Sequence, residues 1–544
     1  MKRFFSILLL ALVIASSATA QQITPVIEVS NPANTTEQQA KHYVILVSLD
    51  GFRYDYPAKY GAPHIQSMAK DGASAPEGML PSYPSLTFPN HLTLVTGLYP
   101  EHHGIVANSF YDATRDDTYV YTQSKTNGDG SWYWGTPLWS LAEQQGMRSA
   151  CFFWPGSEAE IAGKRPSYYL KFDNKIDDKK RVDQVLAWLA LPPEQRPHFI
   201  TLYYSNVDHE GHEHGPDSDE VRAAVHHVDE MIGDLQAGIA ASKLPVDLIV
   251  VADHGMVAFK GDPINLSDFA DLANVHTEGS LIYAKDEAEA AKIYADFKAH
   301  PDPRFSVYRR ADMPKELHYD SNPREGDPVV VPNGPYNIRA KAPAKEGTLR
   351  GGHGFDPVTM PEMKAIFFAE GPDIKASIKL SSFKNVDVYP FIAQLLDLRA
   401  PIGDGSAQPF LKVWTAGSSA VARRGVGDID KTPVGMLKPE PISNEPAFPI
   451  GVGITPPIPL HLVHARYADQ AARTHTQGTT KLRIRIEKDG RVSQVTITKS
   501  LERSLDLSAV RAWSQCTFKP GLKDGNPVVV EMNVESNFST TTAP

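Results

Sequence analysis

The sequence predicts an α/β protein with a small α+β module at its C-terminal end. Continuous apolar, β-rich runs at residues 43–49, 198–204 and 246–252 are typical of parallel strands that are buried on both faces. Helical patterns at residues 183–191 and 218–240 lie between these runs, which gives the alternation of strands and helices found in α/β folds. The composition changes after Trp414, and a compact unit with alternating strands begins further along the chain.

Length and composition limit the class of protein. The chain has 544 residues, of which 42% are hydrophobic and 22% are charged, and this ordinary globular usage excludes a small binding module, a disordered chain and a polytopic membrane protein. Its 54 Lys and Arg residues against 64 Asp and Glu residues give a net charge of −10 at pH 7. We therefore do not expect binding to a nucleic-acid duplex.

Residues 1–20 have the order of a secretory signal peptide. Basic residues precede an apolar run at 4–15, which is followed by small residues up to Ala20. We expect cleavage near Ala20 and a periplasmic or secreted protein. The alternative is a membrane anchor, although the run is shorter than the ~20 residues that a span needs. Residues 21–40, rich in Pro, Asn, Thr and Gln, are expected to form a leader without its own core.

The cysteine content gives no disulfide framework. Cys151 and Cys516 are the only cysteines, and they lie in different predicted domains. We expect two buried free thiols, with a disulfide between them as the alternative.

The core domain is expected to span residues 41–415. An insertion or cap is expected at about 262–350, where one helical pattern, at 286–300, is accompanied by a segment rich in Pro, Gly and Asn. The core pattern resumes with a strand at 364–369 and ends with a helix at 386–396.

A Pro-rich, semi-rigid linker is expected at residues 416–455. The module that follows, residues 456–544, alternates apolar and polar positions on both sides of a hairpin turn signal. Its predicted elements are strands at 481–487, 492–498 and 528–534 and a helix at about 506–515.

Six candidate metal ligands lie where the predicted core strands end or in a Gly-rich segment: Asp50, Asp208, His212, Asp253, His254 and His353. Ligand sites of open parallel sheets lie outside the carboxyl ends of the strands. Oxygen and imidazole ligands without thiolates suit Zn²⁺ or another borderline divalent metal, and six ligands are enough for two sites. Two metals ~3.5–4 Å apart would clamp the attacking and leaving oxygens of an in-line phosphoryl transfer.

Thr87 is the candidate nucleophile. It precedes Phe88 and a predicted helix. A threonine hydroxyl is unreactive at neutral pH, but coordination to a metal can make it an alkoxide, and a helix N-terminus favours a bound phosphate. Taken alone, the alternative for Thr87 is a helix-capping residue.

These residues lie in motifs that together resemble the nucleotide pyrophosphatase/phosphodiesterase family of the alkaline phosphatase superfamily. The motifs are VSLDGFR at Asp50, PSLTFPNHLTLVTGLYPEHHGIVAN around Thr87 and up to Asn108, WPGSE at Trp154, PHFITLYYSNVDHEGHEHG at Asp208, VADHGM at Asp253 and GGHGFDP at His353. They occur in the family's order between about Tyr43 and Pro401. The resemblance implies an alkaline-phosphatase-like mixed sheet sandwiched by helices, with a cap insertion.

The resemblance also implies two zinc ions and a mechanism. One zinc would be held by Asp208, His212 and His353, and the other by Asp50, Asp253, His254 and Thr87. Thr87 would attack phosphorus and give a phosphothreonine intermediate. Asn108 and the backbone N–H of Thr87 would donate hydrogen bonds to the non-bridging oxygens.

Substrate selection is open at this point. In the family a nucleotide base stacks in an aromatic slot, and the equivalent positions are Phe88, Phe172 and Tyr203. Stacking tolerates any base, which would give a broad nucleotide preference, whereas the alternative is that these rings belong to the core. Because choline-phosphodiester and phospholipid-type enzymes also belong to the family, the leaving group stays undetermined.

The C-terminal module resembles the C-terminal domain of TonB energy transducers over about residues 456–538. The similar segments are Tyr467 to Ala471, QGT at Gln477, KLRIRI, DGRV at Asp489, LD at Leu505, FKP at Phe518 and GNPV at Gly525. No transmembrane helix beyond the signal accompanies it, which distinguishes the chain from a transducer. Docking to a periplasmic or outer-membrane protein is one hypothesis, and a stabilising appendage is the other.

The sequence therefore predicts an exported, two-zinc phosphodiesterase that cleaves nucleotide phosphodiester or pyrophosphate bonds. A phosphomonoesterase of the same superfamily is the enzymatic alternative, although the neutral donor Asn108 favours diesters over the more highly charged monoesters. The alternative from another class is an envelope docking protein that acts through its C-terminal module.

Overall fold

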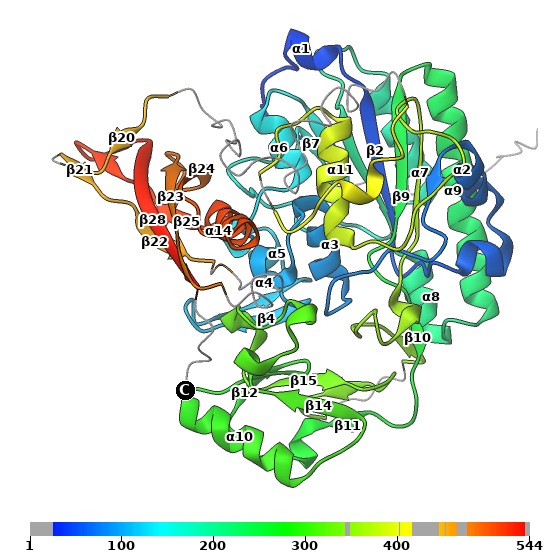
Figure 1. Ribbon diagram of the computed structural model, residues 1–544. Helices are drawn as coiled ribbons and strands as arrows, with labels where there is room; N and C mark the ends of the chain where they lie inside the picture. The colour runs from blue at the N-terminus through cyan, green and yellow to red at the C-terminus, as the bar shows by residue number, and fades with distance from the viewer. Residues whose placement is uncertain are drawn as a thin grey trace, which may run out of the picture.

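The computed structural model describes residues 25–342, 349–401, 403–415, 445–451, 453–463, 465 and 476–538 (Figure 1). The predicted signal peptide at 1–20, most of the predicted linker and the TonB-like segment from Tyr467 to Ala471 lie outside the described residues. Within the described residues, no helix combines the length and the apolar content that crossing a bilayer requires.

A mixed β-sheet of nine strands forms the centre of the described core domain. Its middle strands are β8 (Phe199–Tyr204), β2 (Tyr43–Leu49) and β9 (Val246–Val251), which pair in parallel and are buried along their whole length. Strand order is β1-β7-β6-β8-β2-β9-β18-β3-β19. The outer strands are β1 (Ile27–Glu28), β7 (Tyr168–Tyr169), β6 (Ser149–Phe152), β18 (Phe367–Glu370), β3 (Ala73–Ser74) and β19 (Ile378–Lys379). The three apolar runs are thus confirmed as adjacent buried strands.

One neighbour of the parallel strands runs in the opposite direction. The resumed core strand, predicted at 364–369, is β18, and it pairs antiparallel with β9. This strand makes the sheet mixed, which confirms the predicted fold class.

Helices cover both faces of the sheet (Figure 1). On one side lie α2 (Pro63–Asp71), α7 (Asp178–Leu189) and α9 (Asp219–Ser242), and on the other lie α3 (Thr87–Thr96), α6 (Leu138–Gln144) and α11 (Val388–Leu395). The long α9 begins where the side chain of Ser218 accepts a hydrogen bond from the backbone of Val221. Helix α7 begins five residues before the predicted start, because Asp177 caps it through the N–H of Lys180.

The predicted leader contributes to the core domain. From residue 25 on it runs along the sheet, where β1 pairs antiparallel with β7. Asn34 is buried and donates to the carbonyl oxygens of Pro193 and Arg196. The described part of the leader is therefore packed on the core domain.

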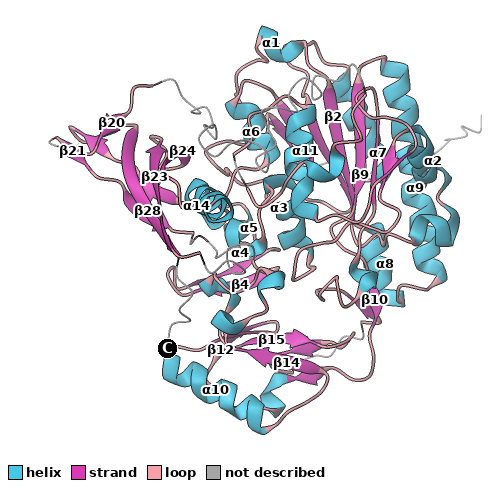
Figure 2. Cartoon of the chain, viewed as in Figure 1, coloured by secondary structure: helices cyan, strands magenta, loops and turns pink. Residues whose placement is uncertain are grey.

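The insertion after β9 forms a small layered unit below the sheet in the view of Figure 2. Its strands are β10 (Val257–Ala258), β11 (Ile264–Asn265), β12 (His276–Glu278), β13 (Leu281–Tyr283), β14 (Phe305–Tyr308), β15 (Val329–Pro332), β16 (Ile338–Arg339) and β17 (Gly351–Gly352), and its helix is α10 (Glu287–Ala299). Ile282, Ile293 and Phe297 belong to a hydrophobic cluster separate from that of the main sheet. Arg324 connects the insertion to the core domain through an ion pair in which its guanidinium lies 2.8 Å from Oδ2 of Asp112.

In the described part of the C-terminal module, a four-stranded sheet packs against helix α14 (Figure 2). The elements of the sheet and its helix are β20 (Phe448–Pro449), β23 (Gly478–Ile486), β24 (Val492–Lys499), β28 (Val530–Phe538) and α14 (Arg503–Gln515), and short pairings are formed by β21 (Ile454–Thr455), β22 (Ile458–His461), β25 (Thr517–Lys519), β26 (Leu522–Lys523) and β27 (Asn526–Pro527). Strands β20 and β21 lie within the predicted linker at 416–455 but pair with β28 and β26 of the module. Hydrogen bonds between described residues join the module to the core domain: Arg491 donates to the hydroxyl of Thr136 at 3.3 Å, and Gln515 donates to Asp404 at 3.4 Å. Cys151 and Cys516 are both buried and free.

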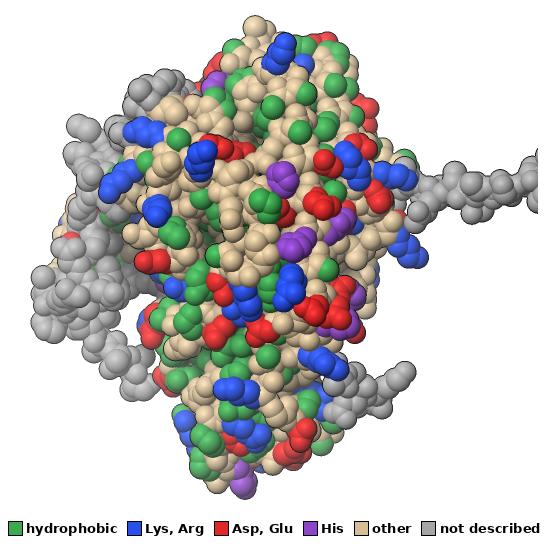
Figure 3. Space-filling view, turned by 90° about the vertical axis from the view of Figure 1, so that its right-hand side faces the viewer, with side chains coloured by type: hydrophobic (Ala, Val, Ile, Leu, Met, Phe, Trp, Pro, Cys, Tyr) green, Lys and Arg blue, Asp and Glu red, His purple; other side chains and the backbone are tan. Residues whose placement is uncertain are grey.

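Charged side chains are mixed on the surface that Figure 3 shows. Among the described residues drawn in colour, Lys and Arg side chains are interspersed with Asp and Glu side chains rather than collected in one stripe. On this face, the described basic side chains therefore form no continuous stripe.

Candidate metal centre

The carboxyl ends of three adjacent strands bring most of the predicted ligands together. Asp50 follows β2, and Asp253 with His254 follow β9. Asp208 and His212 lie on α8 (Asn206–His214), which begins two residues after β8. Since parallel strands end at the same edge, residues that are far apart in sequence meet there.

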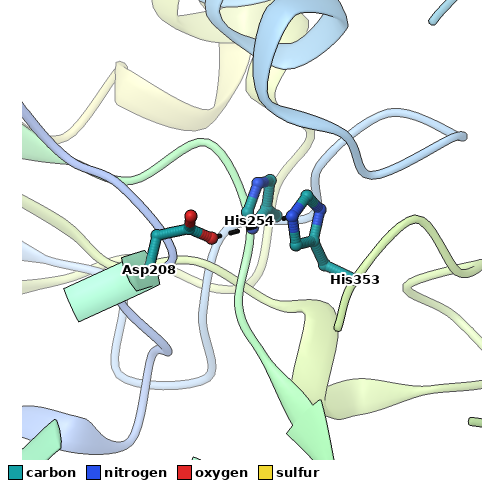
Figure 4. Close-up of side chains that lie close together, drawn as sticks. All are labelled: Asp208, His254 and His353. Carbon is teal, nitrogen blue, oxygen red and sulfur yellow. Dashed lines mark ion pairs between the residues drawn. The ribbon is translucent and has the colours of Figure 1, made fainter. Parts of the chain in front are cut away.

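His353 reaches this edge through the base of the insertion. Strands β10 and β17 pair antiparallel, so the chain that leaves after His254 returns next to it. The rings of His254 and His353 stack with centroids 3.6 Å apart, and Figure 4 shows both imidazoles beside the carboxylate of Asp208. The two residue pairs between β10 and β17 therefore bring His353 next to His254.

The predicted ligands form two adjoining groups. In one, Oδ1 of Asp208 lies 3.5 Å from Nε2 of His212 and 3.6 Å from Nε2 of His353. In the other, Nε2 of His254 lies 3.0 Å from Oδ2 of Asp253 and 3.6 Å from Oδ1 of Asp50. His254 also lies within 4.8 Å of the donor atoms of Asp208 and His353, so the two groups share a boundary.

All three histidines present the same nitrogen to the site. Their Nδ1 atoms donate to backbone carbonyl oxygens: His212 to Gly351 at 2.9 Å, His254 to Gly255 at 3.0 Å and His353 to Ser85 at 2.9 Å. A carbonyl oxygen only accepts, so each Nδ1 carries a proton and each ring turns its Nε2 atom toward the site. Fixing the tautomer in this way is how proteins prepare histidines for metal binding.

The site needs a cation to satisfy its buried atoms. Nε2 of His212 and Nε2 of His353 face each other at 3.2 Å with their lone pairs. Three carboxylate oxygens are buried without a hydrogen-bond partner among the described residues: Oδ1 of Asp50, Oδ1 of Asp208 and Oδ2 of Asp253. Such orphaned acceptors are costly unless a positive charge lies between them, so the donor set fits bound metal.

Electrostatics support the same interpretation. Burial and the neighbouring carboxylates of Asp253 and Asp208 raise the pKa of Asp50 well above its ordinary value. Burial, together with His254 and His212, lowers the pKa of His353 well below its usual range. A divalent cation would favour the ionised carboxylates and the neutral imidazole that ligation needs.

Thr87 lies at the first residue of α3, beside these ligands. Its Oγ1 is 3.2 Å from Nε2 of His254. Oδ1 of Asn108 accepts a hydrogen bond from the N–H of Phe88 at 3.0 Å, which fixes the carboxamide against the start of α3 and leaves its NH₂ group as a donor. The hydroxyl, the helix N-terminus and the Asn108 amide are thus collected at one point.

Two residues that support Thr87 were not identified as site residues from the sequence. His91, one turn further on α3, is fully buried, and its Nδ1 lies 2.8 Å from the Thr87 carbonyl oxygen and 3.3 Å from Oδ2 of Asp253. The carbonyl of Ser85 orients His353, while the Ser85 hydroxyl accepts from the N–H of Gly354.

The three aromatic residues do not form a single stack. Phe172, 52% exposed, contacts Tyr203 with ring centroids 6.0 Å apart, whereas Phe88 contacts Tyr121 at 5.2 Å. Tyr203 is buried, and its hydroxyl donates to Oδ2 of Asp50 at 2.5 Å. Tyr121 is partly exposed beside Phe88, and the sequence analysis did not single it out.

A family model described as type I phosphodiesterase / nucleotide pyrophosphatase matches residues 44–356, which include every ligand named above. The chain belongs to this family. A second family model, Gram-negative bacterial TonB protein C-terminal, matches residues 463–540. Both predicted resemblances, and membership of this enzyme family, are therefore confirmed.

Individual relatives agree with the family. The chain is 35% identical over 387 residues to an uncharacterized pyrophosphatase/phosphodiesterase of Schizosaccharomyces pombe, covering 67% of this chain and 78% of that protein. It is 35% identical over 381 residues to human ectonucleotide pyrophosphatase/phosphodiesterase family member 1, covering 66% of this chain but only 40% of the human protein.

Solved structures of murine family member 5 share the fold. One has a TM-score of 0.65 and 29% identity, and covers 69% of this chain and 100% of that chain. Another, with a TM-score of 0.64 and 28% identity over 69% of this chain and 100% of that chain, is described as an inactive threonine-to-alanine variant in complex with AMP.

Proposed function

We propose that this protein is a zinc-dependent hydrolase of nucleotide phosphodiester and pyrophosphate bonds that works through a phosphothreonine intermediate on Thr87. The observation that carries this proposal is the convergence on Thr87 of six ligand-type side chains, with three imidazole Nε2 atoms turned inward by their carbonyl partners. A structural site would have no use for an adjacent hydroxyl at a helix N-terminus.

Zinc is the metal that suits this donor set. The ligands are imidazoles and carboxylates without thiolates, and catalytic zinc sites use such ligands with an open position. Asp208, His212 and His353 would hold one ion, and Asp50, Asp253 and His254 the other, next to Thr87. When bound, the two ions supply positive charge that lowers the pKa of a coordinated hydroxyl or water and neutralises developing negative charge on oxygen.

The protein's own groups perform the bond changes and orient the substrate. The Thr87 oxygen forms a bond to phosphorus while the bond from phosphorus to the leaving oxygen breaks, and the leaving group departs with its electron pair. Water then forms a bond to phosphorus while the bond from phosphorus to the Thr87 oxygen breaks, and a proton from the water restores the Thr87 hydroxyl. The NH₂ of Asn108 and the N–H groups at the start of α3 donate to the non-bridging oxygens, where negative charge is greatest. The inactive threonine variant of murine family member 5 supports a threonine nucleophile.

Nucleotides are the proposed substrates because aromatic faces lie beside the site. The backbone N–H of Phe172 donates to the carboxylate of Glu158 at 2.9 Å, which fixes the backbone at this position. Because the Phe172 side chain is largely exposed, its ring is available for stacking on a base. The AMP complex of murine family member 5 supports the same substrate class. Phe88 and Tyr203 complete the proposed slot, and Tyr203 contacts the ring of Phe172.

The proposed location is the periplasm or the outside of the cell. This location rests on the predicted signal peptide at residues 1–20. It also rests on the TonB-like module, whose family is described as the C-terminal part of a TonB protein of Gram-negative bacteria. A periplasmic or outer-membrane protein is the proposed partner of that module.

Hydrolysis of three substrates tests the proposed activity. Bis-(4-nitrophenyl) phosphate, ATP and 4-nitrophenyl phosphate would be compared by kcat/KM with purified full-length protein. We expect the diester and ATP to be cleaved far faster than the monoester. A strong preference for the monoester would contradict the proposal and favour a phosphomonoesterase.

A further inference from the structure

A second cluster of ligand-type side chains lies at the opposite edge of the central sheet. His42 directly precedes β2, Asp247 is the second residue of β9, and Asp373 lies in the loop that follows β18. Asp50 follows the other end of β2, so the seven residues of that strand, at ~3.3 Å each, put ~23 Å between the cluster and the metal centre. The cluster is therefore separate from the catalytic residues.

The three side chains contact one another. Nδ1 of His42 lies 2.7 Å from Oδ2 of Asp373, and the backbone N–H of Asp373 donates to Oδ1 of Asp247 at 3.1 Å. One donor atom from each residue lies within 4.8 Å of the other two. Gly371 brings the loop onto the strand, because a Cβ there would lie 2.4 Å from Oδ1 of Asp247. The backbone thus holds both carboxylates in place.

One oxygen of this cluster has no partner. Asp247 is 0% exposed, and its Oδ2 is buried without a hydrogen bond. Asp373 is 3% exposed, and within the described residues neither carboxylate forms an ion pair with Lys or Arg. His42 pairs with Asp373 and neutralises at most one of the two carboxylates. Burial and the neighbouring Asp373 raise the pKa of Asp247 well above its ordinary value, because a second buried negative charge is strongly unfavourable without a cation.

The apolar pattern of β9 gives no reason for a carboxylate at this position, and the N–H of Asp373 accounts for only one of its two oxygens. Asp247 interrupts the otherwise apolar strand Val246–Val251, and it is in register with Val44 of β2 in the middle of the sheet. An apolar residue would satisfy the strand pattern without desolvating a charge. The position is thus explained better by a ligand than by the fold.

We propose that His42, Asp247 and Asp373 bind a divalent cation of the zinc class as a structural site. One imidazole and two carboxylates suit zinc, whereas calcium and magnesium prefer oxygen ligands throughout. The His42 side chain is 38% exposed, which gives the ion a route from solvent. Ligands of one zinc lie ~3.3 Å apart at metal–ligand distances of ~2.0–2.1 Å, so His42 would move ~0.6 Å from Asp373 on binding.

The bound ion would join several parts of the core domain. It would connect the starts of β2 and β9 with the loop after β18. Thr415 adds a further segment, since its N–H donates to the carbonyl oxygen of Asp373 at 2.9 Å. This inference does not depend on the proposed catalytic function.

Zinc content of the full-length protein tests the site. Wild type, His42→Gln, Asp247→Asn and the control His226→Gln would be equilibrated with zinc, passed over a desalting column and measured by elemental analysis. His226 is an exposed histidine on α9 outside both clusters. We expect His42→Gln and Asp247→Asn each to hold about one zinc per chain less than wild type, and His226→Gln to hold the same amount as wild type. Because the result is a difference, it stands whether or not the catalytic centre also holds zinc.

Crystals of the zinc-loaded protein provide a second readout. We expect an anomalous peak at the zinc edge between His42 and Asp247. Equal zinc content in wild type and His42→Gln, with no such peak, would overturn the proposal and show that a proton holds the two carboxylates together. If Asp247→Asn fails to fold, the zinc content of His42→Gln alone tests the site. The His42 side chain is 38% exposed, so its replacement leaves no cavity in the hydrophobic core.

Discussion

The hydroxyl of Tyr203 lies 2.5 Å from Oδ2 of Asp50 and donates a hydrogen bond to it across two neighbouring strands. Tyr203 is in register with Ser48, two residues before Asp50, so the parallel pairing of β8 and β2 aims the ring at the end of β2. This contact leaves Oδ1 of Asp50 free for a metal ion, since it is the oxygen without a hydrogen-bond partner. Tyr203 therefore orients a ligand of the metal centre.

Removal of this hydroxyl tests its role. Tyr203→Phe keeps the ring but loses the hydrogen bond to Asp50, and second-sphere partners of this kind affect metal affinity by roughly 10–100-fold. We expect zinc affinity, measured by titration of the metal-free protein against a competing chelator, to weaken by about that factor. Tyr204→Phe is the matched control, because the buried Tyr204 hydroxyl has no hydrogen-bond partner. Equal affinities in the two variants would refute the orienting role.

The proposed donor Asn108 is expected to act on turnover rather than on metal binding. Asn108→Ala removes an amide aimed at the transition state, and the loss of one such donor typically lowers kcat about 10²–10³-fold. Zinc content should not change, because Asn108 contacts the N–H of Phe88 and no candidate ligand. Kinetics with bis-(4-nitrophenyl) phosphate and elemental analysis check both parts. A control, Asn174→Ala, removes an amide that contacts Ser205, and it should leave kcat unchanged.

A buried histidine predicts loss of stability in mild acid. Burial lowers the pKa of His103 to about 3, where its Nε2 contacts the carbonyl of Pro89 and the hydroxyl of Thr93. The folded state keeps the ring neutral, whereas the unfolded state binds a proton below about pH 6.5. The contribution of His103 to the free energy of unfolding is therefore fully present above about pH 6.5. It decreases as the pH falls toward 3, and about 2 kcal/mol of it is lost at pH 5.

Urea unfolding at pH 7 and pH 5 measures this effect. His103→Gln has no titrating ring, so its free energy of unfolding should fall about 2 kcal/mol less than that of wild type between the two pH values. The comparison is made within each protein, so a constant cost of the substitution cancels. An identical decrease in both proteins would show that His103 does not contribute.

The C-terminal module is expected to be dispensable for hydrolysis. It has its own hydrophobic cluster, which includes Leu482, Ile484 and Phe518, and the metal centre lies entirely within the core domain. A chain that ends at Thr415 should hydrolyse the diester with a kcat/KM within about two-fold of the full-length value, because no catalytic group is removed. Loss of activity in a truncated protein that retains its far-UV spectrum would contradict the modular organisation.

Long-range pairing limited what the sequence could predict about the fold. The run at residues 43–49 is apolar at every position and gave the bounds of β2 directly, since such a run has one environment in an α/β protein. Strands of two residues, such as β1 and β17, carry no periodicity and were not predicted. The antiparallel direction of β18 likewise depends on its partner β9 and not on its own sequence.

Some residues of the candidate site could likewise be identified from the sequence, whereas others depend on long-range pairing. Asp50 and Asp253 could be found because they end buried strands, where sites of parallel sheets form. His353 was a candidate ligand from its Gly-rich segment, but its grouping with Asp208 and His212 came only from the resemblance, because its position depends on a two-residue pairing across the whole insertion. Asp247 was overlooked inside an apolar run, where a single carboxylate does not alter the strand pattern.

The central claim, a metal-activated threonine nucleophile, is tested most directly with Thr87→Ala. Hydrolysis of bis-(4-nitrophenyl) phosphate and ATP would be measured for wild type and variant, with the zinc content of each determined. The account predicts that wild type binds about two zinc ions at the metal centre and cleaves both substrates, and that the variant keeps its zinc but loses turnover. Undiminished turnover in Thr87→Ala, or a wild type that binds no metal and cleaves neither substrate, would contradict it.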